Sequence, residues 1–225
     1  KRAEQQVRSL YNREVAAFPP QGLTYDDSCF AQESKDHNKP GRRYIGVFGS
    51  ATNSMITAQK NLLAPLLQFP SASFGNFIEE EKSNNDGEIR LKLKENCENP
   101  FVDPYGTIIW YFNSLRELGY ADTLLVSDIS EYLKNLCRRY NIEPQLRRFN
   151  LQVTELTSRA KDSAISEILK LLEEKWTPKP WDEKKCLDVL LATNMISVGV
   201  DINRLGLMVI TGQPKSTSEY IQASS

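Results

Sequence analysis

The feature that most constrains this fold is an alternation of short apolar runs and amphipathic segments in the second half of the 225-residue chain. The runs have strand length and are rich in β-branched or aromatic residues; they are residues 107–112, 151–158, 186–193 and 205–212. Helical periodicity lies between or after them, at residues 127–140, 162–176 and 216–225. This alternation predicts an α/β fold with a mostly parallel sheet and helices on both faces.

Polar residues that can cap helices mark the starts of two of these segments. Ser127 or Asp128 can accept the free N–H groups at the start of the first helix. Ser216 or Ser218 can do the same for the last one. We therefore expect the two helices to begin there.

The first hundred residues are less regular and hold stretches rich in Pro, Gly and Asp, which favour loops. Residues 43–50 are compatible with a short strand, and residues 54–69 predict a helix that Ser54 caps. Pro65 lacks an N–H group and should kink or end that helix. The predicted domains are an irregular arm or insertion at residues 1–100 and an α/β lobe at residues 101–225.

Composition argues against several classes of function. The net charge is −1, which gives no general attraction to polyanions. The four cysteines form no CxxC pair, and the single histidine cannot complete a metal cluster. We expect reduced thiols and no metal site. Since no apolar run reaches the ~20 residues of a membrane helix, we also expect a cytoplasmic protein.

Polar residues follow the predicted strands where these end. In open parallel sheets, ligands bind in the loops beyond the carboxyl ends of the strands. Residues 157–159 and 193–201 occupy such positions. Small hydroxyl and amide side chains there suit contact with phosphate groups and demand no base sequence.

Several stretches in a fixed order resemble the C-terminal half of superfamily-two helicases. GTIIWYFNSLREL resembles the fourth conserved motif of that family, and LLATNMISVGVDI resembles the fifth. The strand LGLMVITGQP follows, and SEYIQASS resembles the opening of the sixth motif. With ELTSRAKDSAISEILKLLE, the chain is also similar to the helicase component of DISARM-type bacterial phage-defence systems. The resemblance implies a second RecA-like lobe; it covers residues 101–225 well and residues 1–100 only loosely.

The resemblance implies roles for individual residues on two sides of this lobe. Gly199 and Asp201 match the end of the fifth motif and would lie at the ATP cleft, as would Gln222 from the sixth. The residues implied to contact the nucleic-acid backbone are Thr193, Asn194, Asn113, Ser114, Thr157, Ser158 and Arg159.

Each of these roles has a structural alternative. Gly199 can serve only as a turn glycine and Asp201 only as a cap. Asn113 and Ser114 can cap the helical turn that follows them. Arg159 can be a solvated surface charge.

Other conspicuous residues are interpreted as structural. Trp110, Trp176 and Trp181 are interpreted as packing residues rather than platforms for stacked bases. The arginine pairs at 138–139 and 147–148 are interpreted as solvated charges.

The chain lacks a GxxxxGK[ST] loop, which in such enzymes cradles the nucleotide phosphates and helps to place Mg²⁺. By the resemblance, the arginine of the sixth motif would follow Ser225. Because the chain starts at Lys1 and stops inside a predicted helix, we expect a piece of a longer protein. ATP and Mg²⁺ are expected to act in that parent, with neither bound to this chain alone.

Two functions of different class follow. The first is the second motor lobe of an ATP-dependent translocase or helicase, inactive as an ATPase alone. Its expected partners are single-stranded nucleic acid, with DNA favoured, the first RecA-like lobe and other defence-system subunits. The alternative is a non-motor nucleic-acid-binding or protein-docking module built on a degenerate helicase lobe. Neither function involves a membrane.

Overall fold

The structure is a computed structural model, and it describes residues 2–16, 41–52, 54–81, 102–160, 162–176, 186–193 and 202–224. The chain divides into two compact units, Lys1–Val47 and Phe48–Ser225, and each is described by itself. In the parts that are described, no helix is long and apolar enough to cross a membrane.

The first unit contains helix α1 (Arg2–Tyr11), which the sequence analysis does not predict. Within it, the Ser9 hydroxyl donates to the Gln5 carbonyl oxygen at 2.7 Å. The strand predicted at residues 43–50 is wrong: residues 41–48 form no regular structure, and a 3₁₀ turn, η1, spans Gly49–Thr52. Residues 41–48 are exposed, and Ile45 is 75% exposed. Because these residues are exposed and are not packed in a sheet, their apolar side chains do not lead to a strand.

The second unit is built on a four-stranded parallel sheet with the order β2-β3-β1-β4. Its strands are β1 (Ile108–Phe112), β2 (Val153–Leu156), β3 (Val189–Ala192) and β4 (Met208–Thr211). Each strand lies inside one of the four predicted runs. The parallel α/β architecture expected from the sequence is confirmed.

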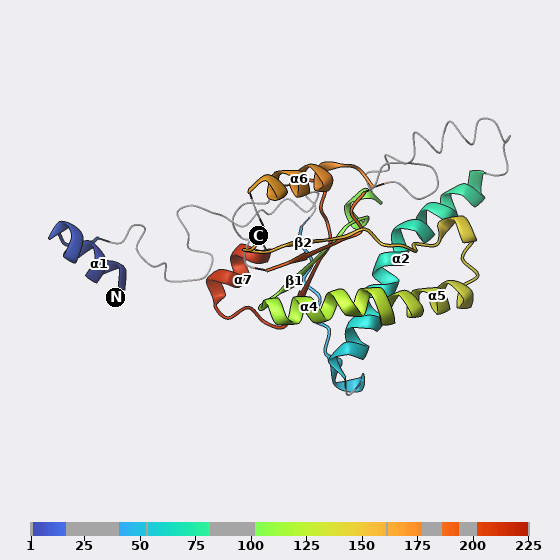
Figure 1. Cartoon of the computed structure of the whole chain (residues 1–225), viewed down its shortest axis with the longest axis horizontal. Coiled ribbons are helices and arrows are strands. Elements are labelled where there is room, and N and C mark those ends of the chain that lie inside the picture. Colours follow the sequence, from blue (N-terminus) through green and yellow to red (C-terminus); the bar gives the residue numbers. More distant parts are fainter. Residues whose placement is uncertain are drawn as a thin grey trace. The chain divides into compact units, whose positions relative to one another are not determined.

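Helices cover both faces of this sheet. Figure 1 shows α6 (Asp162–Glu173) on one side and α4 (Leu115–Leu124) with α5 (Ser130–Arg139) on the other. Side chains alternate along β1, so Trp110 and Phe112 enter one core and Tyr111 enters the other. The first core is completed by α2, α4 and α5, and the second by α6 (Asp162–Glu173) and α7 (Thr217–Ser224).

Helix α2 (Met55–Glu81) begins as predicted but does not end where predicted. The Ser54 hydroxyl accepts from the Thr57 N–H at 3.4 Å, which confirms the cap. The helix then continues through Pro65, so the expected end near residue 69 is wrong. Pro65 and Asn61 are both exposed, so water can reach the Asn61 carbonyl group that loses its helical donor. Burial of Leu63 and Leu67 in the core holds both sides of the proline in place.

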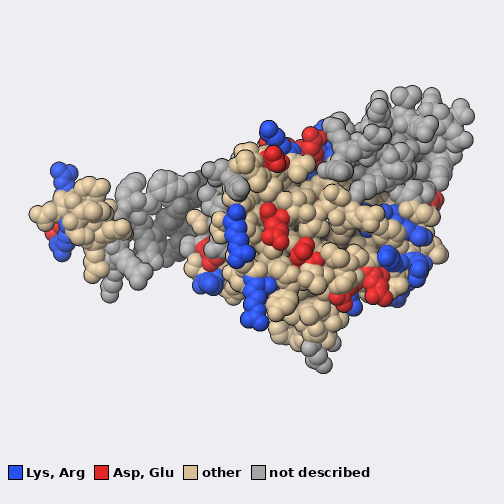
Figure 2. All heavy atoms as spheres, viewed as in Figure 1, with Lys and Arg blue, Asp and Glu red and all other residues tan. Residues whose placement is uncertain are grey.

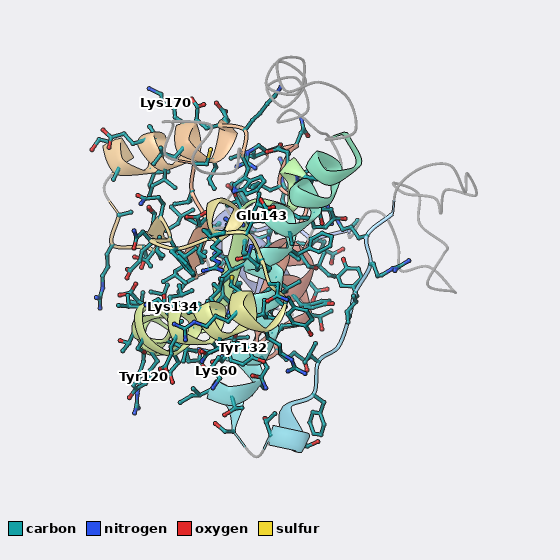
Figure 3. All side chains as sticks on the ribbon, turned by 90° about the vertical axis from the view of Figure 1, so that its right-hand side faces the viewer. Lys60, Tyr120, Tyr132, Lys134, Glu143 and Lys170 are labelled. Carbon is teal, nitrogen blue, oxygen red and sulfur yellow. The ribbon has the colours of Figure 1, made fainter. Side chains whose placement is uncertain are left out.

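Helix α2 packs against α5 (Ser130–Arg139). The Lys60 ammonium group lies over the ring of Tyr132, 5.4 Å from its centroid, and Figure 3 labels both residues. Although α2 falls in the predicted arm, its packing places it in the compact unit of the sheet.

A continuous helical run joins α4 (Leu115–Leu124) to α5 through a π-helical turn, η3 (Leu125–Ile129). The predicted start at Ser127 or Asp128 is therefore wrong. Ser127 lies within the run, and its hydroxyl donates to the Thr123 carbonyl oxygen at 2.8 Å. In the π-helical turn, the Ser130 hydroxyl donates to the Leu125 carbonyl oxygen at 2.7 Å.

Helix α7 contacts the sheet through one buried side chain and a polar bond. Ser216 caps it, accepting from the Glu219 N–H at 3.2 Å, as one of the two predicted caps would. Of the side chains described in α7, only that of Ala223 is buried. The hydroxyl of Tyr111, which is fully buried in β1, donates to Glu219 Oε1 at 3.0 Å.

A buried polar cluster ties together the amino-terminal ends of the strands. The Arg148 guanidinium pairs with the Asp188 carboxylate and also donates to the carbonyl oxygens of Leu67 (2.9 Å) and Gly106 (2.8 Å). The second carboxylate oxygen of Asp188 accepts from the Gln152 N–H at 2.7 Å. The guanidinium group also lies over the indole ring of Trp176, with Arg148 Cζ 5.1 Å from the ring centroid.

Gly106 lies against Trp176, which yields a prediction about stability. A Cβ at residue 106 would overlap the Cβ and Cγ of Trp176, whereas a Cβ at Gly119 in α4 meets nothing within 4 Å. We expect Gly106→Ala to lower the free energy of unfolding by about 1–3 kcal/mol through overpacking. Gly119→Ala is the matched control and should raise it by about 0.5–1 kcal/mol, because alanine favours a helix. Urea unfolding of both variants checks this, and equal effects would contradict it.

The Tyr111–Glu219 bond predicts a pH dependence. Burial, and then the adjacent Glu219 carboxylate, raise the pKa of Tyr111 to about 12, from an ordinary value of 10.0. Because the folded pKa is the higher one, this stabilisation is complete below pH 10 and is lost as the pH rises toward 12.

We therefore expect the difference in unfolding free energy between the wild type and Tyr111→Phe to be constant from pH 8 to about 9.5 and to shrink above pH 10. Urea midpoints measured at each pH test this. A difference that stays constant up to pH 11.5 would show that the hydroxyl does not titrate with folding.

Candidate nucleic-acid and nucleotide interface

The carboxyl ends of the strands bring the predicted contact residues to one edge of the sheet. The register pairs Ala192 of β3 with both Tyr111 of β1 and Leu156 of β2. The residues after each strand, Thr193, Thr157 and Asn113, therefore follow one another along this edge. The three residues thus lie beyond the carboxyl ends of neighbouring strands, where ligands bind in open parallel sheets, and their contact with a ligand stays a prediction.

Thr157 and Thr193 are the innermost residues of this edge. They are 4% and 8% exposed, and the Thr193 N–H donates to the Leu156 carbonyl oxygen at 3.3 Å. The Thr157 hydroxyl accepts from the Arg159 N–H at 3.4 Å, within a turn that also joins the Ala160 N–H to the Thr157 carbonyl group. The turn leaves Ser158 and Arg159 exposed. This exposure suits a phosphate contact and equally suits a solvated charge.

Asn113 holds the ends of two strands together. Its Nδ2 donates to the carbonyl oxygens of Thr211 at 3.4 Å and Gln213 at 3.1 Å. Because carbonyl oxygens only accept, these bonds fix which end of the amide is the nitrogen. Asn113 Oδ1 is buried and has no hydrogen-bond partner among the described residues. Since phosphate oxygens also only accept, a phosphate contact by Asn113 would require its donors to leave these carbonyl groups.

Ser114 adopts the structural alternative that the sequence left open. Its hydroxyl accepts from the Glu117 N–H at 3.3 Å and donates to Glu117 Oε2 at 3.0 Å. These bonds make it the cap of α4. Its side chain is half-buried at the same edge as Thr193, and a role in nucleic-acid contact stays a prediction.

Of the residues predicted to lie at the ATP cleft, the structure describes only Gln222. Gln222 lies on the exposed side of α7, next to the buried Ala223. Asn194, Gly199 and Asp201 lie outside the described residues, and their roles stay predictions.

Two of the three tryptophans are packing residues, as predicted. Trp110 is fully buried and Trp176 is 4% exposed, while Trp181 lies outside the described residues. The Trp110 Nε1–H donates to the Thr211 hydroxyl at 2.7 Å. The interpretation of residues 147–148 as solvated charges is wrong for Arg148, which is buried beside Asp188.

Charges of both signs are mixed over the face drawn in Figure 2, consistent with the net charge of −1. Steering of nucleic acid by a broad basic surface therefore has no support on that face. Within the described parts of the chain, no group of three or more His, Cys, Asp or Glu side chains is arranged to hold a metal ion.

Sequence reasoning missed the polar contacts through which β1 holds its neighbours. Tyr111 was part of an apolar run, and its bond to Glu219 joins residues 108 positions apart. The bond from Trp110 Nε1–H to the Thr211 hydroxyl likewise joins residues 101 positions apart. The only available signal was the Ser-x-x-Glu spacing at residues 216–219, which indicates a cap and not a strand partner.

The family model for the helicase conserved C-terminal domain matches residues 114–225. The chain is also 42% identical over its whole length to the DISARM protein DrmA of Bacillus paralicheniformis, and it spans 18% of the length of that relative. These findings confirm the resemblance stated from the sequence motifs. Residues 114–225 of this chain belong to the helicase conserved C-terminal domain family.

Proposed function

We propose that this chain contributes the second motor lobe of an ATP-driven nucleic-acid translocase. The observation that carries the proposal is the common edge of the sheet at which Asn113, Thr157 and Thr193 directly follow β1, β2 and β3. Hydroxyl groups at such an edge can bind phosphates of a single strand without reading bases. Ser158 and Arg159, both exposed, would add contacts beside them.

The same lobe would supply half of an ATP cleft. Gly199 and Asp201 would line it after β3, and Gln222 would approach it from α7. When bound, ATP with Mg²⁺ would supply the energy of translocation. The phosphate-binding loop and the carboxylate that holds Mg²⁺ would come from a first RecA-like lobe in the same longer protein. The lobe by itself would not hydrolyse ATP.

The biological setting is proposed from the relative. Because the chain is 42% identical to a protein named DISARM protein DrmA, we infer that its parent acts in a DISARM-type phage-defence system. Single-stranded DNA would then be the substrate track, and other subunits of the system would be its partners.

The decisive measurement is the DNA-stimulated ATPase activity of the full-length protein. We expect Asp201→Ala to lower kcat/KM for ATP. Thr193→Ala and Thr193→Val should each raise the DNA concentration for half-maximal stimulation by roughly ten- to a hundredfold, because a hydrogen bond to a charged group is worth about 1.5–3 kcal/mol.

Two matched variants control this experiment. Thr193→Ser keeps the hydroxyl group and should behave like the wild type. Thr123→Val removes an exposed hydroxyl from α4 and should have no effect on stimulation. Unchanged rates in both Asp201→Ala and Thr193→Val would refute the site. A wild-type protein that binds DNA and shows no ATPase activity would favour the non-motor docking module.

A further inference from the structure

Helix α7 carries Gln222, and of its described side chains only that of Ala223 is buried in the core. Tyr220 is 36% exposed and Ile221 is 57% exposed, whereas Ala223 is 6% exposed. One buried methyl group is a single point of attachment, and a single point does not by itself fix the rotation of an eight-residue helix about its own axis.

A polar contact between β1 and α7 gives the helix a second point of attachment. Tyr111 is fully buried in the central part of β1, and its hydroxyl donates to Glu219 Oε1 at 3.0 Å. Burial raises the pKa of Tyr111 to about 12, so this hydroxyl keeps its proton throughout the neutral range. Hydrogen bonds between a neutral donor and a carboxylate are shorter and stronger than neutral ones.

The spacing along α7 makes this contact decisive for Gln222. Glu219 and Ala223 are four residues apart and therefore share the face that meets the sheet. Gln222 precedes Ala223 and lies on the exposed flank. Two fixed points on one face set the rotation of the helix, and with it the direction of Gln222.

Strand β1 also fixes the segment that leads into α7. Asn113 lies two residues beyond Tyr111, and its Nδ2 donates to the Gln213 carbonyl oxygen at 3.1 Å. Gly212, at φ +72°, makes the turn between β4 and that contact. The start of the segment and the helix itself are thus both tied to one strand.

We propose that Tyr111 is a positioning residue for the nucleotide, because through Glu219 it sets the orientation of α7 and of Gln222. The inference rests on the proposed function, in which Gln222 lies at the ATP cleft. Tyr111 itself would touch neither ATP nor nucleic acid.

The test uses the full-length protein and steady-state ATPase kinetics with saturating single-stranded DNA. Tyr111→Phe should raise the KM for ATP by roughly tenfold, the loss expected for one hydrogen bond to a charged group, with kcat changed less than about twofold. The affinity for a labelled oligonucleotide without ATP, measured by fluorescence anisotropy, should stay at the wild-type value.

Variants of the partner make the contact itself testable. Glu219→Gln retains an oxygen that can accept from the tyrosine hydroxyl but loses the charge, so its KM should fall between those of the wild type and Tyr111→Phe. Glu219→Ala should match Tyr111→Phe, and the double variant Tyr111→Phe/Glu219→Ala should be no worse than Glu219→Ala alone.

The possible failures are distinguishable. An active wild type whose KM is unchanged by Tyr111→Phe would overturn this inference and leave the proposed function intact. Parallel losses of kcat and DNA affinity would also overturn it, since they indicate general damage to the lobe; a lower thermal midpoint alone would not, because the lost hydrogen bond stabilises the fold. A wild type without DNA-stimulated ATPase activity would overturn the proposed function, and this inference with it.

Discussion

The buried pair of Arg148 and Asp188 is the interaction on which the rest of this lobe depends. An isolated charge in a core costs several kcal/mol, so each member is tolerated only because the other is present, and loss of one partner typically costs about 3–5 kcal/mol. The pair also accounts for backbone groups that no strand satisfies: the Leu67 carbonyl group of α2, the Gly106 carbonyl group and the Gln152 N–H. One buried contact thus connects the long helix, the entry to β1 and the approach to β2.

This arrangement separates structural from functional polar groups along the strands. At the amino-terminal ends, Arg204 donates to the Leu172 carbonyl group at 2.7 Å and to the Thr107 hydroxyl at 2.8 Å, so charges there serve the fold. At the carboxyl ends, Ser158 and Arg159 remain exposed. A sheet whose amino-terminal edge is fastened internally can present its other edge to a ligand without losing its own support.

The sequence predicted the architecture well because strands and helices differ in their periodicity, and each of the four strands lies within a predicted run. Element ends were less predictable, since burial decides them: Pro65 and Ser127 carry local stop and start signals, yet each lies inside a helical run that packs on the core. The location of the candidate site at the carboxyl edge of the sheet could be predicted from the parallel topology. The hydrogen bonds of Asn113 could not be predicted, because they depend on which strand lies next to β1.

Strand β1 makes polar contacts that its apolar sequence pattern does not predict. Three residues in or next to β1 donate hydrogen bonds to three different segments. Trp110 donates to Thr211 on one face of the sheet, and Tyr111 donates to Glu219 on the other. Asn113 donates to the Gln213 carbonyl oxygen in the turn after β4. An apolar run predicts only that such a strand is buried. Because burial removes water as a competing partner, each of these polar tips must bond to a specific neighbour. The central strand therefore determines where β4 and α7 lie, and with them the segment that carries Gln222.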